Sequence, residues 1–144
     1  MTSTKLARHK TLFIVYGSSS CPYCKILANF LKEEYGEEKV VFCDTKNDPA
    51  CDKLYDELVE LIDFQPLIPL TCVVRDNRVV AIIQGAVLDK GYWDKVLENP
   101  PDPPEVFIRK VIRGVGRIEK NTRFDEEKIM KIIKTSLEAL NKKK

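Results

Sequence analysis

The fold is decided by the stretch from Thr11 to Cys24, TLFIVYGSSSCPYC. Its first six residues are apolar or β-branched without alternation, which is typical of a strand buried on both faces. Gly17 and the serines after it form a turn that ends this strand. Pro22 is suited to begin a helix, because proline has no N–H to lose in the first turn. The stretch therefore predicts a strand, a turn and a helix whose start carries two cysteines.

The spacing of Cys21 and Cys24 suits conversion between a dithiol and a disulfide. The free N–H groups and the positive dipole end of a helix N-terminus favour a negatively charged sulfur there. Since the thiolate is the nucleophile in disulfide exchange, we expect Cys21 to attack. Cys24, one turn further along, is expected to resolve the mixed disulfide. The pair predicts redox chemistry.

Half of a structural zinc site is the alternative interpretation of the pair. A zinc site needs four ligands at compact spacing, and the sequence has no second Cys-x-x-Cys or Cys-x-x-His. The other candidate ligands are single and widely separated: His9, Cys43, Cys51 and Cys72. We therefore expect no metal site, and we interpret Cys43, Cys51 and Cys72 as small buried hydrophobic residues.

Length and charge limit the classes of function. A chain of 144 residues suits one domain of ordinary size. The net charge of +2 gives no strong attraction to nucleic acid or to a membrane surface, and the apolar run near the N-terminus is short for a signal peptide or a span. Five cysteines do not suggest a secreted disulfide framework. We expect a cytoplasmic monomer without a nucleic-acid or membrane partner.

The charged fraction of 32% favours a thermophilic source for the protein. Hyperthermophiles tolerate disulfides in their cytoplasm.

Hydrophobic periodicity and turn residues give the order of the remaining elements. Two strands joined through a helix form a βαβ unit with a right-handed crossover, which places the cysteine pair at the carboxyl edge of a parallel sheet. The predicted elements are a helix at 22–34, a strand at 39–43, a helix at 48–63, a hairpin of strands at 70–74 and 79–83, and a helix at 89–97.

A proline-rich segment divides the chain. Residues 99–104 hold four of the eight prolines, so no helix or ladder is expected to pass through them. We predict a domain at 1–99, a linker at 100–104 and an extension at 105–144 docked on that domain. The extension begins with a short apolar patch at 106–108 and 111–112, bends at Gly114 and Gly116, and ends in an amphipathic helix at 126–140. Its apolar stripe is Ile129, Ile132, Ile133, Leu137 and Leu140.

Residues 11–98 resemble a known superfamily. The strand, the CPYC tetrad and the helix are similar to glutaredoxin, while the downstream half is similar to thioredoxin. Ile68-Pro69 matches the position of the superfamily's cis-proline. The mixture is similar to a CPYC unit of archaeal protein disulfide oxidoreductases. The resemblance implies an α/β, thioredoxin-like fold, a four-stranded mixed sheet with flanking helices, to which this chain adds a C-terminal helical extension.

The resemblance also implies an activity and its partners. It implies a thiol-disulfide oxidoreductase that reduces or exchanges protein disulfides, with Cys21 and Cys24 as the catalytic pair. No bound cofactor is expected, because an external dithiol, a thioredoxin reductase or glutathione would supply electrons. Glutaredoxins usually grip glutathione with Gly-Gly and acidic residues, and this chain has Gly85-Ala86 instead, which leaves glutathione binding open.

The residues implied to contact substrate surround the cysteine pair. The backbone of Ile68 would pair with the substrate chain, and Tyr23 would form the rim of the site. Lys25 either stabilises the thiolate or points to solvent, and Gly85 either borders the groove or serves a turn that needs φ > 0. The expected substrate-binding residues are Pro22, Tyr23, Ile68, Pro69, Gly85 and Ala86.

A binding protein is the second functional hypothesis. It would be a glutaredoxin-like carrier of an iron–sulfur cluster, held by Cys21 and an external thiol across a dimer. Cys24 and Pro22 count against this hypothesis, because the chain can close its own disulfide. Visible absorbance after anaerobic purification would distinguish the two hypotheses.

Overall fold

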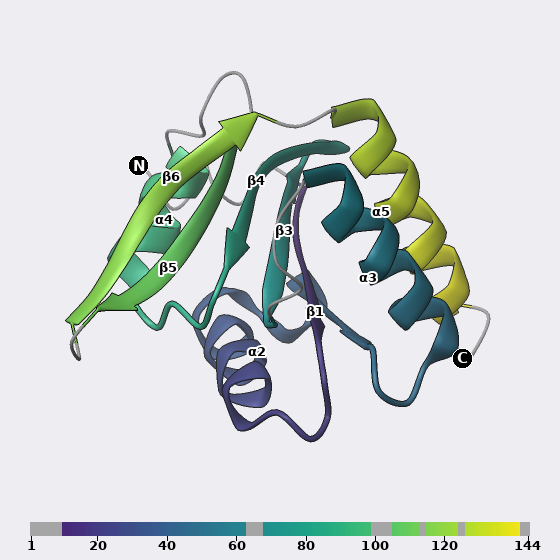
Figure 1. Ribbon diagram of the computed structural model, residues 1–144, viewed down its shortest axis with the longest axis horizontal. Helices are drawn as coiled ribbons and strands as arrows, with labels where there is room; N and C mark the ends of the chain where they lie inside the picture. The colour runs from purple at the N-terminus through teal and green to yellow at the C-terminus, as the bar shows by residue number, and fades with distance from the viewer. Residues whose placement is uncertain (1–9, 63–67, 99–104, 113–114, 124–125, 142–144) are drawn as a thin grey trace.

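The computed structural model describes residues 10–62, 68–98, 105–112, 115–123 and 126–141 (Figure 1). His9 and the predicted linker at 100–104 lie outside these residues. Predicted and observed ends agree closely where they can be compared; the first helix, for example, ends one residue later than expected. The elements are β1 (Thr11–Gly17), α2 (Pro22–Tyr35), a 3-10 turn η1 (Glu37–Lys39), β2 (Val40–Asp44), α3 (Pro49–Ile62), β3 (Leu70–Arg75), β4 (Arg78–Gln84), α4 (Lys90–Glu98), β5 (Glu105–Ile112), β6 (Val115–Arg123) and α5 (Glu126–Asn141).

The strands form one mixed sheet in the order β2-β1-β3-β4-β5-β6. β1 is parallel to β2 and antiparallel to β3, and β3 is antiparallel to β4. The four strands β2-β1-β3-β4 with their flanking helices form a thioredoxin-like fold, as predicted.

The sheet continues beyond these four strands. β5 joins β4 in parallel, and β6 returns antiparallel to β5. The apolar patch and bend expected here are two paired strands, which the sequence did not predict; the chain reverses between them, and Gly114 lies outside the described residues. The charged pair Arg109-Lys110 interrupts the apolar residues of β5, so the segment gives the pattern of two fragments rather than one eight-residue strand.

The central sheet is covered on both faces (Figure 1). Successive β1 residues point to opposite sides: Phe13 and Val15 pack in the cluster with α2 and α4, and Ile14 and Tyr16 in the cluster with α3 and α5. This explains why β1 lacks polar alternation. Both clusters consist of fully or largely buried side chains, including Leu27, Leu31, Trp93 and Val96 in the first and Leu58, Cys72, Ile129 and Ile133 in the second.

The last helix lies beside α3 on the second face (Figure 1). Ile129 and Ile133 of α5 are fully buried, and Ile132 is 7% exposed. A buried hydrogen bond joins Ser136 of α5 to Tyr16 of β1. The helix therefore contributes to the same core as the first strand.

The β3–β4 hairpin follows directly from its turn residues. Asp76 and Asn77 have φ of 51° and 66°. A two-residue type I′ turn requires positive φ at both positions, and Asp and Asn accept it more readily than most residues. The predicted hairpin is confirmed.

Among the helices of the described residues, none has the length and apolar character needed to cross a membrane.

Candidate active site

Strand register brings three loops to one end of the sheet. Tyr16 of β1 pairs with Leu70 of β3, and Leu70 pairs with Gln84 of β4. The turn that leads from β1 to Cys21, the segment before β3 and the segment after β4 therefore leave the sheet at the same edge. This is the carboxyl edge of β1, where open α/β folds place their functional sites.

Cys21 is the N-cap residue of α2 and is partly exposed. Its extended backbone conformation, with φ −96° and ψ 110°, marks the change from turn to helix. Its N–H donates to the Ser18 carbonyl at 3.0 Å, and its own carbonyl accepts from Lys25 N at 3.3 Å. Pro22 follows in the first turn, as predicted. The Cys21 thiol thus lies at the positive end of the helix dipole.

Cys24 lies one turn further along and is fully buried. Burial raises the pKa of its thiol to about 12, and a hydrogen bond with the Cys21 side chain adds to this rise. A hydrogen bond from the Ser18 backbone lowers the pKa of Cys24 and partly offsets this rise. At neutral pH, Cys24 is therefore a protonated thiol with almost no access to solvent, whereas Cys21 can be reached.

Gly17 allows this close packing of Cys24. A Cβ atom at position 17 would lie 2.8 Å from Cys24 Cβ and 2.9 Å from its Sγ. Real Cβ atoms essentially never come so close to a neighbour. The sequence analysis assigned Gly17 only to a turn and missed this contact, which depends on the helix folding back over the end of β1.

The Ile68–Pro69 peptide bond is cis, as the resemblance implied. The Pro69 carbonyl accepts a hydrogen bond from Gly85 N at 2.8 Å, so the two predicted substrate-binding segments are joined at this edge. Gly85 has φ 107°, which supports the turn interpretation of this glycine. Ile68 is half-buried, and Ala86 is 8% exposed.

Three large apolar side chains are exposed on α2 and in the segment after β4. Tyr23 is 67% exposed and Ile26 is 47% exposed, three residues apart on α2. The buried face of α2 consists of Cys24, Leu27, Ala28 and Leu31, so Ile26 lies outside it. Leu88, in the segment after β4, is also 47% exposed. Lys25 is exposed.

Asp44 is a residue that the sequence analysis missed. It lies at the end of β2, in register with Gly17. Its Oδ1 accepts from the backbone of Ser19 at 3.2 Å and of Lys46 at 3.0 Å, and its Oδ2 accepts from Asn47 Nδ2 at 2.9 Å. Asn47 Nδ2 also donates to Ser19 Oγ at 2.7 Å. Asp44 thus holds the turn that precedes Cys21.

The charge of Asp44 is stabilised in place. Burial opposes the charged form, but the hydrogen bonds from Asn47, Ser19 and Lys46 outweigh it and hold the pKa of Asp44 below its usual value. Its position at the carboxyl end of the strand parallel to β1 is a signal from which its proximity to the turn could have been inferred.

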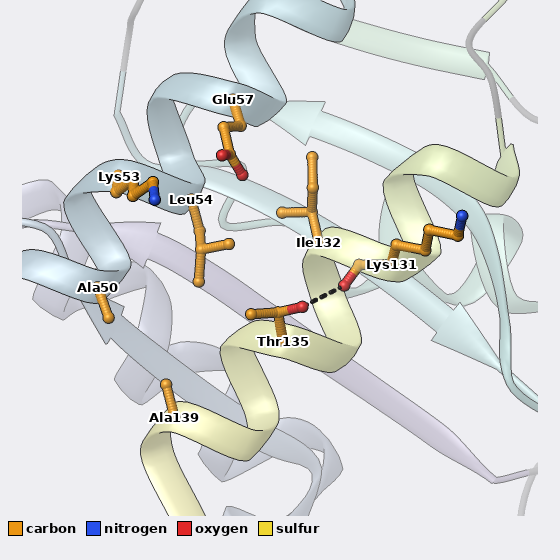
Figure 2. Close-up of a pocket in the computed structure, with 8 residues that line it drawn as sticks. All are labelled: Ala50, Lys53, Leu54, Glu57, Lys131, Ile132, Thr135 and Ala139. Atoms are coloured by element: carbon orange, nitrogen blue, oxygen red, sulfur yellow. Dashed lines mark hydrogen bonds between the residues drawn. The ribbon is translucent and has the colours of Figure 1, made fainter.

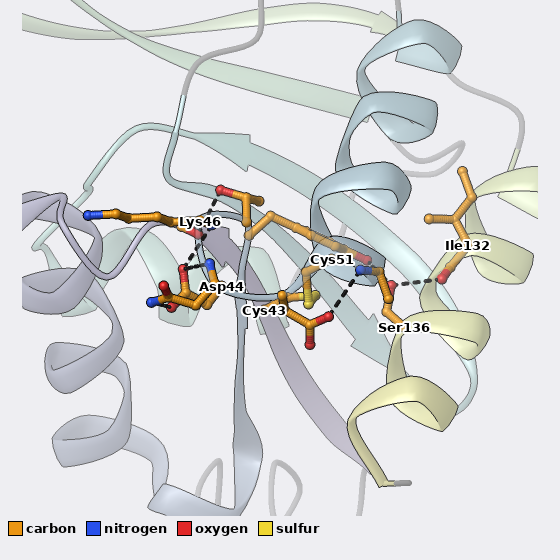
Figure 3. The surroundings of a disulfide bond; sticks show 12 residues. Cys43, Asp44, Lys46, Cys51, Ile132 and Ser136 are labelled. Carbon is orange, nitrogen blue, oxygen red and sulfur yellow. Dashed lines mark hydrogen bonds between the residues drawn. A yellow bond between two sulfur atoms is a disulfide. The ribbon is translucent and has the colours of Figure 1, made fainter. Parts of the chain in front are cut away.

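Cys43 and Cys51 form a disulfide across the loop between β2 and α3 (Figure 3). The interpretation of these two residues as unpaired buried hydrophobic residues was therefore wrong. Both are almost completely buried, and Cys43 directly precedes Asp44. Cys72 remains a free buried thiol, as expected. In the described part of the chain, no three metal-ligating side chains come together.

Trp93 packs in the core. It is fully buried, and its indole N–H donates to the Val87 carbonyl at 2.7 Å.

A surface cavity of about 390 Å³ lies away from the cysteine pair, between α3 and α5 (Figure 2). Leu54 and Ile132 are among the apolar residues that line it, and Lys53, Glu57 and Lys131 are among the charged ones. None of the predicted site residues lines this cavity.

Comparison with known proteins gave no match to a family model, to a curated protein or to a solved structure.

Proposed function

We propose that the protein is a thiol-disulfide oxidoreductase that reduces or exchanges protein disulfides through Cys21 and Cys24. The observation that carries the proposal is the difference between the two thiols: Cys21 is accessible at the start of a helix, and Cys24 is buried behind it with a raised pKa. A reachable nucleophile with a protected partner one turn away is the arrangement that two-step exchange requires.

In the first step, the Cys21 thiolate attacks one sulfur of the substrate disulfide. A Cys21–substrate disulfide forms, the substrate S–S bond breaks, and the other substrate sulfur leaves as a thiolate that takes up a proton. In the second step, Cys24 loses its proton and attacks the Cys21 sulfur. The Cys21–Cys24 disulfide forms, and the second substrate thiol is released. Two electrons have then passed from the protein to the substrate.

The surroundings of Cys24 keep its thiol protonated before the second step, because burial and the Cys21 side chain raise its pKa to about 12. Its thiol must ionise as it attacks, and the Ser18 backbone hydrogen bond favours the charged form. An external dithiol, a thioredoxin reductase or glutathione then reduces the Cys21–Cys24 disulfide and closes the cycle.

Substrate binding is assigned to the edge of the sheet around Cys21. We propose that the backbone of Ile68 pairs with an extended substrate segment, next to Pro69, and that Pro22 and Tyr23 form the rim on the helix side. Gly85 and Ala86 would border the substrate segment at the same edge of the sheet. The hydrogen bond from Gly85 N to the Pro69 carbonyl supports this grouping.

The proposal includes a cytoplasmic location, which rests on the composition of the chain. The Cys43–Cys51 disulfide is compatible with that location in a hyperthermophile, whose cytoplasm tolerates disulfides.

The test is reduction of a protein disulfide by the pre-reduced chain. We expect Cys24→Ser to accumulate a mixed disulfide with the substrate, visible by non-reducing electrophoresis and mass spectrometry, because the resolving thiol is missing. Cys21→Ser should give neither turnover nor a trapped complex. Cys72→Ser is the matched control for loss of a thiol and should keep turnover. Equal activity of the Cys21 and Cys24 variants would rule out the assigned roles.

A further inference from the structure

The β5–β6 hairpin projects beyond the end of the four central strands. β4 ends at Gln84, which pairs with Ile108 of β5. β5 continues for four residues to Ile112, and β6 returns from Val115. In the described register, residues 109–112 pair only with residues 115–118. At about 3.3 Å per residue, the projecting part reaches roughly 13 Å past the sheet. We call residues 109–112 and 115–118 the arm; Figure 1 shows it running out to the lower left.

The arm leaves the sheet at the same end as the active site. One row of paired residues crosses four neighbouring strands: Ile108 of β5, Gln84 of β4, Leu70 of β3 and Tyr16 of β1. From Tyr16, the chain continues through Gly17 toward Cys21. Three strand spacings separate β1 from β5, or about 14 Å. A protein that brings a disulfide to Cys21 has dimensions larger than this spacing. The arm is therefore placed to meet the same substrate molecule.

The arm is basic. Its residues include Arg109, Lys110 and Arg117 and no acidic residue, although the whole chain has 24 basic and 22 acidic residues. Lys110 and Arg117 occupy directly opposed register positions on the two strands. Cationic residues at paired register positions, with no acidic residue among the arm's residues, suit a negatively charged ligand.

We propose that the arm binds an acidic segment of the disulfide-bearing substrate protein while Cys21 attacks its disulfide. This inference rests on the proposed oxidoreductase function and adds a substrate class to it. The exposed Tyr23 and Ile26, on the helix that begins at Cys21, favour a protein partner, because they offer apolar contacts to a polypeptide surface. Since an extended chain covers up to about 3.5 Å per residue, an acidic block some five to ten residues from the reactive cysteine can reach the arm.

The test uses three synthetic peptides with the same intramolecular disulfide. A six-residue flexible spacer joins the disulfide to a block of four glutamates, four glutamines or four lysines. The pre-reduced full-length chain is mixed with each peptide, and the second-order rate constant of a single turnover is measured. We expect the glutamate peptide to react about fivefold faster than the glutamine peptide at low salt, and the lysine peptide to react most slowly. The preference should shrink at 1 M salt, where the Debye length falls to about 3 Å.

Three double variants test whether the preference for the glutamate peptide depends on the charges of the arm. Lys110→Gln/Arg117→Gln should lose the preference for glutamate and keep the rate of the glutamine peptide. The exchange Lys110→Arg/Arg117→Lys keeps both charges and should keep the preference. Lys131→Gln/Lys134→Gln removes two exposed charges from α5, on the other side of the molecule, and should also keep it.

The outcomes separate this inference from the proposed function. Equal rates for the three peptides with the unmodified chain would overturn the inference and leave the oxidoreductase function standing. No reaction with any peptide would overturn both. Binding of a fluorescent single-stranded RNA that needs Lys110 and Arg117, without a preference for the glutamate peptide, would show that the arm serves a nucleic acid instead and would also overturn the inference.

Discussion

The hydroxyl oxygens of Tyr16 and Ser136 lie 2.8 Å apart in the core, although 120 residues separate them in the sequence. Ser136 Oγ donates its hydrogen to the Ile132 carbonyl at 2.9 Å, so the Tyr16 hydroxyl must be the donor to Ser136. Burial raises the pKa of the Tyr16 hydroxyl far above its usual value, so it remains a donor at any ordinary pH. This bond joins α5 to the strand that ends next to the turn before Cys21.

The direction of this bond predicts unequal effects of the two substitutions. Ser136→Ala leaves the buried Tyr16 hydroxyl without an acceptor and should lower the free energy of unfolding by about 1–3 kcal/mol. Tyr16→Phe leaves Ser136 bonded to Ile132 and should cost about 1 kcal/mol. Urea denaturation of both variants and of the double variant measures the effects. We expect the double variant to lose less than the sum of the two single losses, and a larger loss for Tyr16→Phe than for Ser136→Ala would contradict the assigned direction.

Loss of the Cys43–Cys51 disulfide should destabilise the fold. In the chain-entropy account, closing a loop over a sequence separation of 8 contributes about 2.5 kcal/mol. We expect Cys43→Ala/Cys51→Ala to lower the free energy of unfolding by about this amount, and a strong reductant to lower it similarly in the unmodified chain. Cys72→Ala, which keeps the disulfide, should remain sensitive to reductant. If reductant destabilised the double variant as much as the unmodified chain, the effect would not come from this bond.

The central fold could be predicted because its signals are local. The uniform apolar run of β1, the turn residues Asp76 and Asn77 and the proline at the start of β3 each determine a nearby element. The strands β5 and β6 could not be predicted in the same way, because they have charged residues among apolar ones, and β5 depends on pairing with β4 as β6 does on pairing with β5. A strand of this composition becomes recognisable only with its partner in place.

The candidate site was predicted only in part, because some of its contacts are local and others join separate segments. The CPYC spacing identifies the two thiols within one turn of helix. The contacts of Asp44 with Ser19 and of Gly17 with Cys24 join segments that are separate in the sequence, so no local pattern reveals them. The burial of Cys24 on the inner face of α2, together with Leu27, likewise depends on how the helix packs against the sheet.

The two cysteines should differ strongly in their response to pH. Because burial is the largest cause that raises the pKa of Cys24 to about 12, its thiol remains almost entirely protonated near pH 8. In Cys21→Ser, alkylation of Cys24 by iodoacetamide should therefore be slow at pH 8 and should accelerate as the pH rises. In Cys24→Ser, the partly exposed Cys21 should react much faster at pH 8. Mass spectrometry of the modified peptide gives both rates, and a faster reaction of Cys24 at pH 8 would reverse the roles of the two residues.

Gly17→Ala should disturb the active site through packing alone. The new methyl group would lie 2.8 Å from Cys24 Cβ, so the first turn of α2 must move or the core must loosen. Overpacking of this kind costs about 1–3 kcal/mol, and we expect a matching loss in the free energy of unfolding together with slower reduction of protein disulfides. The shift should also make Cys24 more accessible to alkylation, which a purely global loss of stability would not do under conditions where the variant remains folded.

Gly91→Ala is the matched control for Gly17→Ala. Its new methyl group would meet only Asp89 Oδ1, the end of a side chain, at 3.2 Å. Because Gly91 lies in the exposed first turn of α4, alanine should leave stability unchanged or raise it by up to about 1 kcal/mol, and activity should be unchanged. Equal behaviour of the two alanine variants in denaturation, activity and Cys24 alkylation would show that the contact between Gly17 and Cys24 does not constrain the site.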